Sequence, residues 1–324
     1  MKVVDMHCDT ISEIWYSHSN ENPKQLSKND LHIDIDKMKK GDYFLQNFAM
    51  FIDLEKSENP FSYIMNLIDI FYSEIEKNKN DISVIKSYED ILEAKEQGKM
   101  CAMLTAEEGE CCEGKLENLY TLYDRGVRMM TLTWNHKNSL GGPNLYNSDG
   151  SIDGGAKLTK TGIEFVEEMQ RLGVIIDVSH LSDAGFYDVV NNSNKPFVAS
   201  HSNARALCYH RRNLTDEMIR IIAERGGVIG LNYYGEFLTE PGGDKKTPSR
   251  ISDMAKHARH IINVGGKECI GLGSDFDGID GELEMKNCTY LPKLAEELER
   301  QGFTNNEIEG IFYKNVLRVY REML

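Results

Sequence analysis

The 324-residue sequence lacks any apolar run long enough to cross a membrane, and its longest apolar runs have the length of a β-strand. Basic residues are also few, since 37 lysines and arginines stand against 52 aspartates and glutamates and give a formal charge of −15. No basic stripe is present that could replace the counterions of a nucleic acid. The first residues, MKVVDMHCDT, contain no hydrophobic signal core. We therefore expect a cytoplasmic protein whose partners include neither nucleic acid nor membrane.

Cysteine pairs at regular spacing are absent as well. The seven cysteines are an odd number scattered over a large acidic chain, which does not fit a disulfide framework. Cys111 and Cys112 are adjacent, a pattern that could serve redox or soft-metal chemistry, but no second pair lies at zinc-finger spacing. We interpret all seven as reduced thiols, with no chemical role for this pair.

What the sequence does contain is a regular alternation of apolar runs and helix-like segments. The eight runs are 3–7, 45–52, 100–106, 126–133, 174–178, 196–200, 227–232 and 269–274. Amphipathic segments such as 115–125, 160–173 and 215–227 lie between them. Apolar strands that alternate with helices predict a parallel sheet, and eight units predict an α/β fold of the (β/α)8 TIM-like barrel type, as a single domain over 1–324. A doubly wound open sheet is the alternative, although no Gly-rich dinucleotide fingerprint supports it.

Ionisable residues follow six of the eight predicted strands. They are His7 and Asp9, Glu107 and Glu108, the segment Trp134 to His136, His180, His201, and Asp275 with Asp277. The carboxyl ends of the strands of a (β/α)8 barrel meet at one face, where the chemistry of such proteins takes place. We therefore expect these side chains to converge on one site.

The residue types and their spacing predict a metal centre. In DMHCD, the alternation of a strand places His7 and Asp9 on one face, so that they can offer one nitrogen and one oxygen to a single ion. His180 and His201 add two imidazoles from consecutive strands, and a carboxylate such as Glu108 can span two ions. This mixture of nitrogen and oxygen ligands suits Zn²⁺ better than Mg²⁺ or Ca²⁺.

These motifs resemble those of the membrane (renal) dipeptidase family of binuclear zinc peptidases. The order His-x-Asp, Glu-Gly, Asp-x-Ser-His, Ser-His-Ser, Arg-Arg-Asn and Gly-Ser-Asp-Phe-Asp-Gly is reproduced, and the resemblance runs from DMHCDT to NVLRV. It implies an enzyme that hydrolyses the peptide bond of dipeptides by means of a hydroxide that bridges two Zn²⁺ ions per chain.

The resemblance also implies the metal ligands. The five residues are His7, Asp9, Glu108, His180 and His201, with Glu108 shared by both ions. Glu108 is preferred to Glu107 because the ligand of the family directly precedes a glycine, here Gly109. Glu107 is then expected to be a neighbouring structural carboxylate.

Further residues receive roles by the same resemblance. Asp275 would carry the proton from the attacking water to the leaving amine, and Arg212 would bind the carboxylate of the dipeptide. Tyr234 is a candidate for the same pocket. The sequence departs from mammalian members at Trp134, where they carry a histidine that holds the substrate carbonyl, and His136 is the candidate to replace it.

Two other functions remain open at this point. One is a related metal-dependent amidohydrolase acting on N-acyl amino acids or cyclic amides. The other is a zinc-binding barrel without catalysis, against which the presence of Asp275 and Arg212 argues. A homodimer is compatible with the sequence, and the Gly- and Pro-rich stretches 138–155 and 237–250 are expected to form walls or lids of the site.

Overall fold

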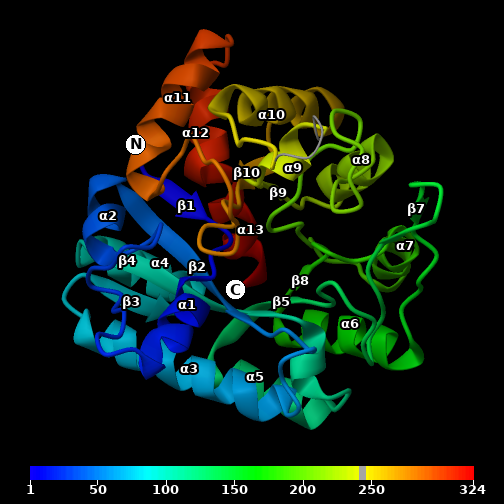
Figure 1. The fold of residues 1–324 in the computed structure, drawn as a ribbon, viewed down its shortest axis with the longest axis horizontal. Helices are drawn as coiled ribbons and strands as arrows, with labels where there is room; N and C mark the ends of the chain where they lie inside the picture. The colour runs from blue at the N-terminus through cyan, green and yellow to red at the C-terminus, as the bar shows by residue number, and fades with distance from the viewer. Residues whose placement is uncertain (241–245) are drawn as a thin grey trace.

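A parallel sheet of eight strands forms the centre of the computed structural model, which describes residues 1–240 and 246–324 (Figure 1). Its strands are β1 (Val3–Asp5), β2 (Tyr43–Phe51), β3 (Ile82–Ile85), β4 (Met100–Glu107), β5 (Val127–Thr131), β8 (Ile175–Asp177), β9 (Ile229–Leu231) and β10 (Ile270–Leu272). Neighbours follow the order β8-β5-β4-β2-β1-β10-β9, and β3, which the sequence analysis did not predict, pairs with the first half of β4. A separate hairpin of β6 (Leu145–Tyr146) and β7 (Ile152–Asp153) lies beside α7 at the periphery (Figure 1).

The segment 196–200, which was predicted as the sixth strand of the barrel, joins the two ends of this sheet. It makes two parallel bridges, Asp177 with Val198 at the end of β8 and Ala199 with Ile229 at the start of β9. The bridges are short, but they connect β8 to β9 and complete the circuit of strands. The predicted α/β barrel is therefore confirmed, with the sixth strand reduced to two bridges.

Helices surround the strands (Figure 1). The α-helices are α1 (Thr10–Tyr16), α2 (Ile35–Lys40), α3 (Pro60–Lys77), α4 (Tyr88–Glu96), α5 (Leu116–Arg125), α6 (Lys160–Leu172), α7 (Asp183–Asn192), α8 (Asp216–Glu224), α9 (Gly235–Leu238), α10 (Ile251–Gly265), α11 (Leu291–Arg300), α12 (Asn305–Glu309) and α13 (Asn315–Met323). Single turns are η1 (Ser17–Ser19), η2 (Gly109–Cys112), η3 (Cys288–Tyr290) and the π-helical η4 (Gly310–Lys314). The three predicted helical segments correspond to α5, α6 and α8.

The hydrophobic core has two layers, because alternate side chains of each strand point to opposite faces of the sheet. An inner layer gathers side chains from the first halves of the strands with others from α13; it includes Val4, Met6, Leu45, Cys101, Met103, Met129, Ile175, Val198, Val316, Val319 and Tyr320. A larger outer layer fills the space between the sheet and the helices. The C-terminal helix thus closes the end of the barrel opposite to the strand ends that carry the predicted site.

Two glycines allow the segment 196–200 to approach the last strands of the barrel. A Cβ atom placed on Gly230 in β9 would lie 1.8 Å from the carbonyl oxygen of Ser200, and a Cβ on Gly273 would lie 1.8 Å from the same oxygen. Both distances are far below van der Waals contact. The closure of the barrel therefore depends on the absence of side chains at these positions.

Gly230→Ala should destabilise the protein, because the new methyl group must displace the backbone of residue 200. We expect the free energy of unfolding to fall by about 1–3 kcal/mol or more. Gly155→Ala is the matched control, since its Cβ would meet only the side chain of Asp153 at 3.3 Å. Denaturant unfolding measures both, and equal midpoints for the two variants would show that closure does not depend on Gly230.

Candidate active site

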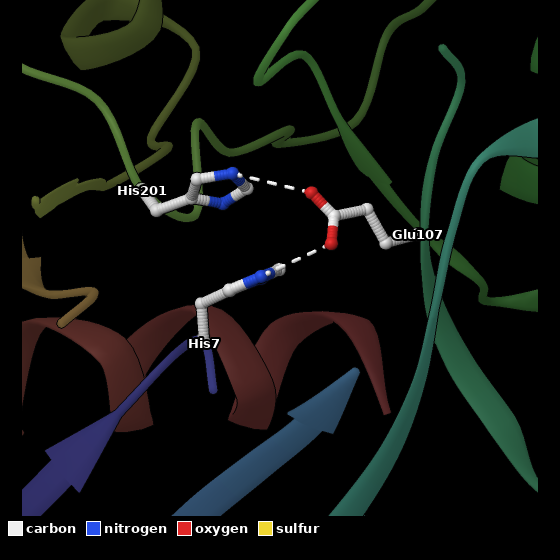
Figure 2. A group of neighbouring side chains, drawn as sticks. All are labelled: His7, Glu107 and His201. Atoms are coloured by element: carbon white, nitrogen blue, oxygen red, sulfur yellow. Dashed lines mark ion pairs between the residues drawn. The ribbon is translucent and has the colours of Figure 1, made fainter. Parts of the chain in front are cut away.

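The carboxylate of Glu107 lies at the centre of the predicted site, between imidazoles from three different strand ends. Its Oε2 atom is 3.3 Å from Nε2 of His7, and its Oε1 atom is 3.2 Å from Nε2 of His180 and 3.5 Å from Nε2 of His201. Figure 2 shows this carboxylate between His7 and His201, with one oxygen directed to each ring. Each oxygen of Glu107 therefore faces a different group of histidines.

Glu108 does not face the site, so the expectation that it is the shared carboxylate is wrong in its geometry. The backbone leaves the strand at Glu108 with φ 99°, and the side chain turns to the beginning of η2. There it accepts hydrogen bonds from the backbone N–H of Glu110 at 2.9 Å and of Trp134 at 3.0 Å, and from the side chain of Asn138. Glu108 holds this turn in place, and Glu107 occupies the central position that was predicted for Glu108.

Two further carboxylates lie on the His7 side of Glu107. Oδ2 of Asp9 is 3.4 Å from Nε2 of His7, and Oδ1 of Asp275 is 3.9 Å from the same nitrogen. The other oxygen of Asp275 accepts a hydrogen bond of 2.8 Å from the side-chain amide of Asn232. Asn232 thus orients Asp275 so that one oxygen remains directed to the site.

Hydrogen bonds at the outer nitrogens of two histidines fix their tautomers. The hydroxyl of Ser200 donates to the buried carboxylate of Asp177, so Nδ1–H of His201 is the donor in its 2.7 Å contact with the Ser200 oxygen. Nδ1–H of His180 donates to Oδ1 of Asn135 at 3.2 Å. Both rings therefore present an unprotonated Nε2, and these two nitrogens lie 3.0 Å apart. Bonds of this kind orient the imidazole ligands of metal sites.

The electrostatics of the buried groups divide the site into two parts. Burial lowers the pKa of both His180 and His201, so these rings are neutral and offer lone pairs. Burial would also lower the pKa of His7, but the carboxylates of Glu107 and Asp9 outweigh it and raise this pKa well above its ordinary value. Burial, reinforced by Glu107, raises the pKa of Asp9 to about 7. Positive charge is therefore stabilised where these groups meet.

The donor set fits a site for metal ions. Two ligands that each lie ~2.1 Å from a tetrahedral Zn²⁺ are roughly 3.4 Å apart, which is the spacing of the nitrogen and oxygen atoms around Glu107. His7, Glu107 and His201 offer ligand atoms within 4.8 Å of one another, as do His7, Asp9 and Asp275. Nε2 of His7 and Oδ1 of Asp9 are buried and have no hydrogen-bond partner. A cation would satisfy both atoms.

Arg212 and Tyr234, the predicted substrate-binding residues, lie on the His201 side. One guanidinium nitrogen of Arg212 donates to the carbonyl oxygen of His201 at 3.2 Å, while its buried Nε–H has no partner. Burial lowers the pKa of Arg212 to about 10, which leaves it charged at neutral pH. The ring of Phe237 lies 5.5 Å from the Arg212 guanidinium and 4.9 Å from the ring of Tyr234.

His136 lies away from the other predicted residues. The chain bends after β5 instead of remaining extended, and Nδ1 of His136 comes within 3.9 Å of the Glu55 carboxylate. The neighbouring Trp134 and Asn135 face the cleft in its place. The geometry therefore contradicts the prediction that His136 replaces the histidine of the mammalian members. Asn135, which contacts His180, lies in the predicted segment Trp134 to His136 but received no role of its own, because an amide carries little signal in a sequence.

A cleft of about 410 Å³ opens over these residues. It is lined by Asp9, Ser12, Glu13, Tyr16, Phe51, Glu107, Trp134, Asn135, His180, Tyr234, Phe237, Asp275, Asp277, Gly278, Ile279 and Asp280. Phe237 begins the predicted wall 237–250, of which 241–245 lie outside the described residues. Among the described lining residues, none comes from 138–155, so that predicted wall is not part of the cleft.

Comparison with known proteins gives a consistent result. The model of the membrane dipeptidase family, peptidase family M19, matches residues 1–323. An uncharacterized dipeptidase of Schizosaccharomyces pombe is 33% identical over 343 residues, covering 99% of this chain and 80% of the relative. An uncharacterized protein of Klebsiella pneumoniae, from the pqqA 5' region, is 33% identical over 82% of this chain and 97% of its own length.

Solved structures agree with these sequences. Dipeptidase AC, a metallopeptidase of family M19, superposes with a TM-score of 0.91 at 25% identity, covering 100% of this chain and 98% of the other. A metallopeptidase from Rhodobacter sphaeroides, solved with a phosphinate mimic of the dipeptide L-Ala-D-Ala, also gives a TM-score of 0.91, at 23% identity over 100% and 99% of the two chains, and shows the shared fold. None of the helices that the structure describes is both long and apolar enough to span a bilayer. The family match over residues 1–323 and the likeness to dipeptidase AC show that this chain belongs to the membrane dipeptidase family of metallopeptidases.

Proposed function

We propose that this protein is a zinc-dependent dipeptidase whose two ions are held by five residues at the strand ends. The residues are His7, Asp9, Glu107, His180 and His201. The observation that carries the proposal is the position of Glu107, because a single carboxylate with one oxygen toward each group of histidines is suited to join two cations. Nitrogen and oxygen donors together favour Zn²⁺ over the oxygen-binding Mg²⁺.

Two ions bound there would lower the pKa of a shared water and polarise the carbonyl of the peptide bond. Proton transfer and substrate binding would be carried out by residues of the chain. Asp275 is placed to take the proton of the water and to deliver it to the leaving amine, since Asn232 holds one of its oxygens and the other faces the site. Its distance of 3.9 Å from His7 keeps it near the ligands without a hydrogen bond to them.

Arg212 supplies the contact that distinguishes a dipeptide from other amides. Its buried Nε–H has no partner, and a buried donor without a partner is costly. The free carboxylate of a dipeptide would satisfy it and accept a charge-assisted hydrogen bond. Because that carboxylate lies at a fixed distance from the only peptide bond, Arg212 would set which bond lies over Glu107.

Metal stoichiometry tests the site directly. Purified protein should bind two Zn²⁺ ions per chain, and Glu107→Gln should weaken the binding of both, because the amide carries no negative charge and replaces one of the two oxygens by an NH2 group that does not bind a cation. Glu108→Gln is the matched control and should retain two ions. Equilibrium dialysis with elemental analysis measures the occupancy. Two ions in the Glu107→Gln protein, or their loss in the Glu108→Gln protein alone, would return the role to Glu108.

Asp275→Asn tests the proton transfer. The variant should keep both metal ions, since the amide still accepts the contact from Asn232, but its kcat should fall by about 10²–10⁴-fold because it cannot take a proton. Steady-state kinetics on metal-analysed protein measures this. A loss smaller than about tenfold at full occupancy would remove Asp275 from the mechanism.

Arg212 is tested by changing both the residue and the substrate. Arg212→Ala should lower kcat/KM for a dipeptide by about 10- to 150-fold, the value of a lost charge-assisted hydrogen bond, and Arg212→Lys almost as much. Amidating the dipeptide should cost wild type a similar factor and the Ala variant little more. Arg225→Lys is the control, because Arg225 donates to the backbone carbonyls of Ser193 and Val190, which do not line the cleft.

If wild type cleaves amidated and free dipeptides equally well, Arg212 does not read the carboxylate. The enzyme would then be an amidohydrolase acting on N-acyl amino acids or cyclic amides. An amidohydrolase from Pseudomonas aeruginosa with a TM-score of 0.77 and 25% identity, covering 89% of this chain and 91% of its own, shows that this alternative falls within the same fold.

A further inference from the structure

The first helix presents a polar face to the cleft. Asp9, Ser12, Glu13 and Tyr16 all line it, and their spacing of three, four and seven residues places them on one side of α1. The other side of the helix is buried in the core. Of these four residues only Asp9 has a role in the proposed metal site, so the remaining three form a wall with no assigned role.

Two polar groups of this wall have no partner. The hydroxyl of Ser12 is buried, with the residue 1% exposed, and makes no hydrogen bond. The half-buried carboxylate of Glu13 makes no ion pair with any residue in the described ranges. Lys24 and His32 are the groups near it that can carry positive charge, and they contact Asp30 and Asp277 instead. An unpartnered buried hydroxyl beside an unpaired carboxylate indicates that a ligand completes the wall.

The other outer carboxylates of the cleft already have partners within the protein. Asp277 accepts hydrogen bonds from the hydroxyl of Thr10 at 2.6 Å and from the backbone of His32 at 2.6 Å, and lies 3.0 Å from Nδ1 of His32. Asp280 forms an ion pair with Lys246. Burial raises the pKa of Glu13, and the nearby Asp277 carboxylate adds to this effect. Glu13 is therefore the carboxylate of the cleft wall whose charge is left for a ligand.

The position of Arg212 decides which part of a dipeptide meets this wall. Arg212 contacts His201, on one side of Glu107, whereas α1 begins directly after Asp9, on the other side. A dipeptide with its carboxylate at Arg212 and its peptide bond over Glu107 extends its N-terminal residue toward α1. The side chain of that residue then reaches Ser12 and Glu13.

We infer that Glu13 and Ser12 form a subsite for a cationic side chain, so that the enzyme prefers dipeptides whose N-terminal residue is lysine or arginine. This inference rests on the proposed function. The carboxylate of Glu13 pairs with the ammonium or guanidinium group of the substrate. The hydroxyl of Ser12 accepts a hydrogen bond from one N–H of the same group. The ring of Tyr16 and the side chain of Ile279, which both line the cleft, cover the aliphatic stem of the substrate.

Lysyl-alanine and norleucyl-alanine test the subsite. The two dipeptides differ at the end of the N-terminal side chain, which carries a positive charge only in lysyl-alanine. On metal-loaded wild type at low ionic strength, kcat/KM should be about tenfold or more higher for lysyl-alanine. Glu13→Gln should abolish this ratio while leaving norleucyl-alanine hydrolysis nearly unchanged. Ser12→Ala should reduce the ratio several-fold. Glu21→Gln, an exposed change of the same charge outside the cleft, should leave it intact.

The ratio should also shrink in about 1 M salt, where the Debye length is ~3 Å. Equal rates for the two substrates in wild type would overturn the inference and leave dipeptidase activity standing. An equal loss for both substrates in Glu13→Gln would also overturn it, because Glu13 would then bind the α-amino group that both share. If metal-loaded protein hydrolyses neither dipeptide, the proposed function fails. Calorimetric affinities of the same two compounds then decide whether Glu13 selects the cationic one.

Discussion

The buried carboxylate of Glu107 is the group on which the arrangement of the site depends. With 4% of its surface exposed, it has lost most of its hydration, which costs several kcal/mol unless opposite charge or strong donors replace the water. The replacement comes from His7, His180 and His201, each at the end of a different strand. A shift of any of these strands by one residue would turn its side chain to the other face of the sheet. The contacts around Glu107 therefore form only when the strands of the barrel have this register.

Two further buried carboxylates hold the histidine-bearing backbone in place. Asp5 accepts a hydrogen bond from the N–H of His7 at 3.2 Å, and Asp177 accepts from the N–H groups of Ser179 and Ser200 at 2.9 Å each. These serines directly precede the two other histidines of the site. Both aspartates lie in otherwise apolar strands, where a carboxylate is unfavourable unless it is fully hydrogen-bonded. These hydrogen bonds fix the backbone at His7 and directly before His180 and His201, and so orient the three imidazoles one layer above.

The sequence was sufficient to predict the barrel and the convergence of the histidines at its strand ends, because both depend on where apolar runs end. The position of Glu107 among the histidines, where Glu108 was predicted, did not follow from it. In β4, Cys101 and Met103 point into the barrel, so the alternation of the strand places Glu107 on the inner face and Glu108 outside it. The prediction of Glu108 rested on the adjacent Gly109 and not on this alternation. The strand at 196–200 was recognised from its composition, but its reduction to two bridges depends on glycines in neighbouring strands, which a single segment cannot reveal.

The backbone beyond the strand ends does not follow the regular alternation of the strands. Glu108, His180, Asp275 and Asp277 all have positive φ, between 62° and 99°, a conformation that costs a residue with a side chain about 1–3 kcal/mol. The alternation of side chains holds within a strand such as β4 but does not extend beyond its end, which is why His136 lies near Glu55 instead of the cleft. Glycine would relieve the strain at each position but could not provide a carboxylate or an imidazole. At His180 and Asp275 this conformation directs the side chain toward the site. At Glu108 and Asp277 it instead directs the side chain to hydrogen-bond partners outside the central cluster. The strain at His180 is thus a consequence of placing its imidazole 3.2 Å from the Glu107 carboxylate, and the hydrophobic layers beneath must offset its cost.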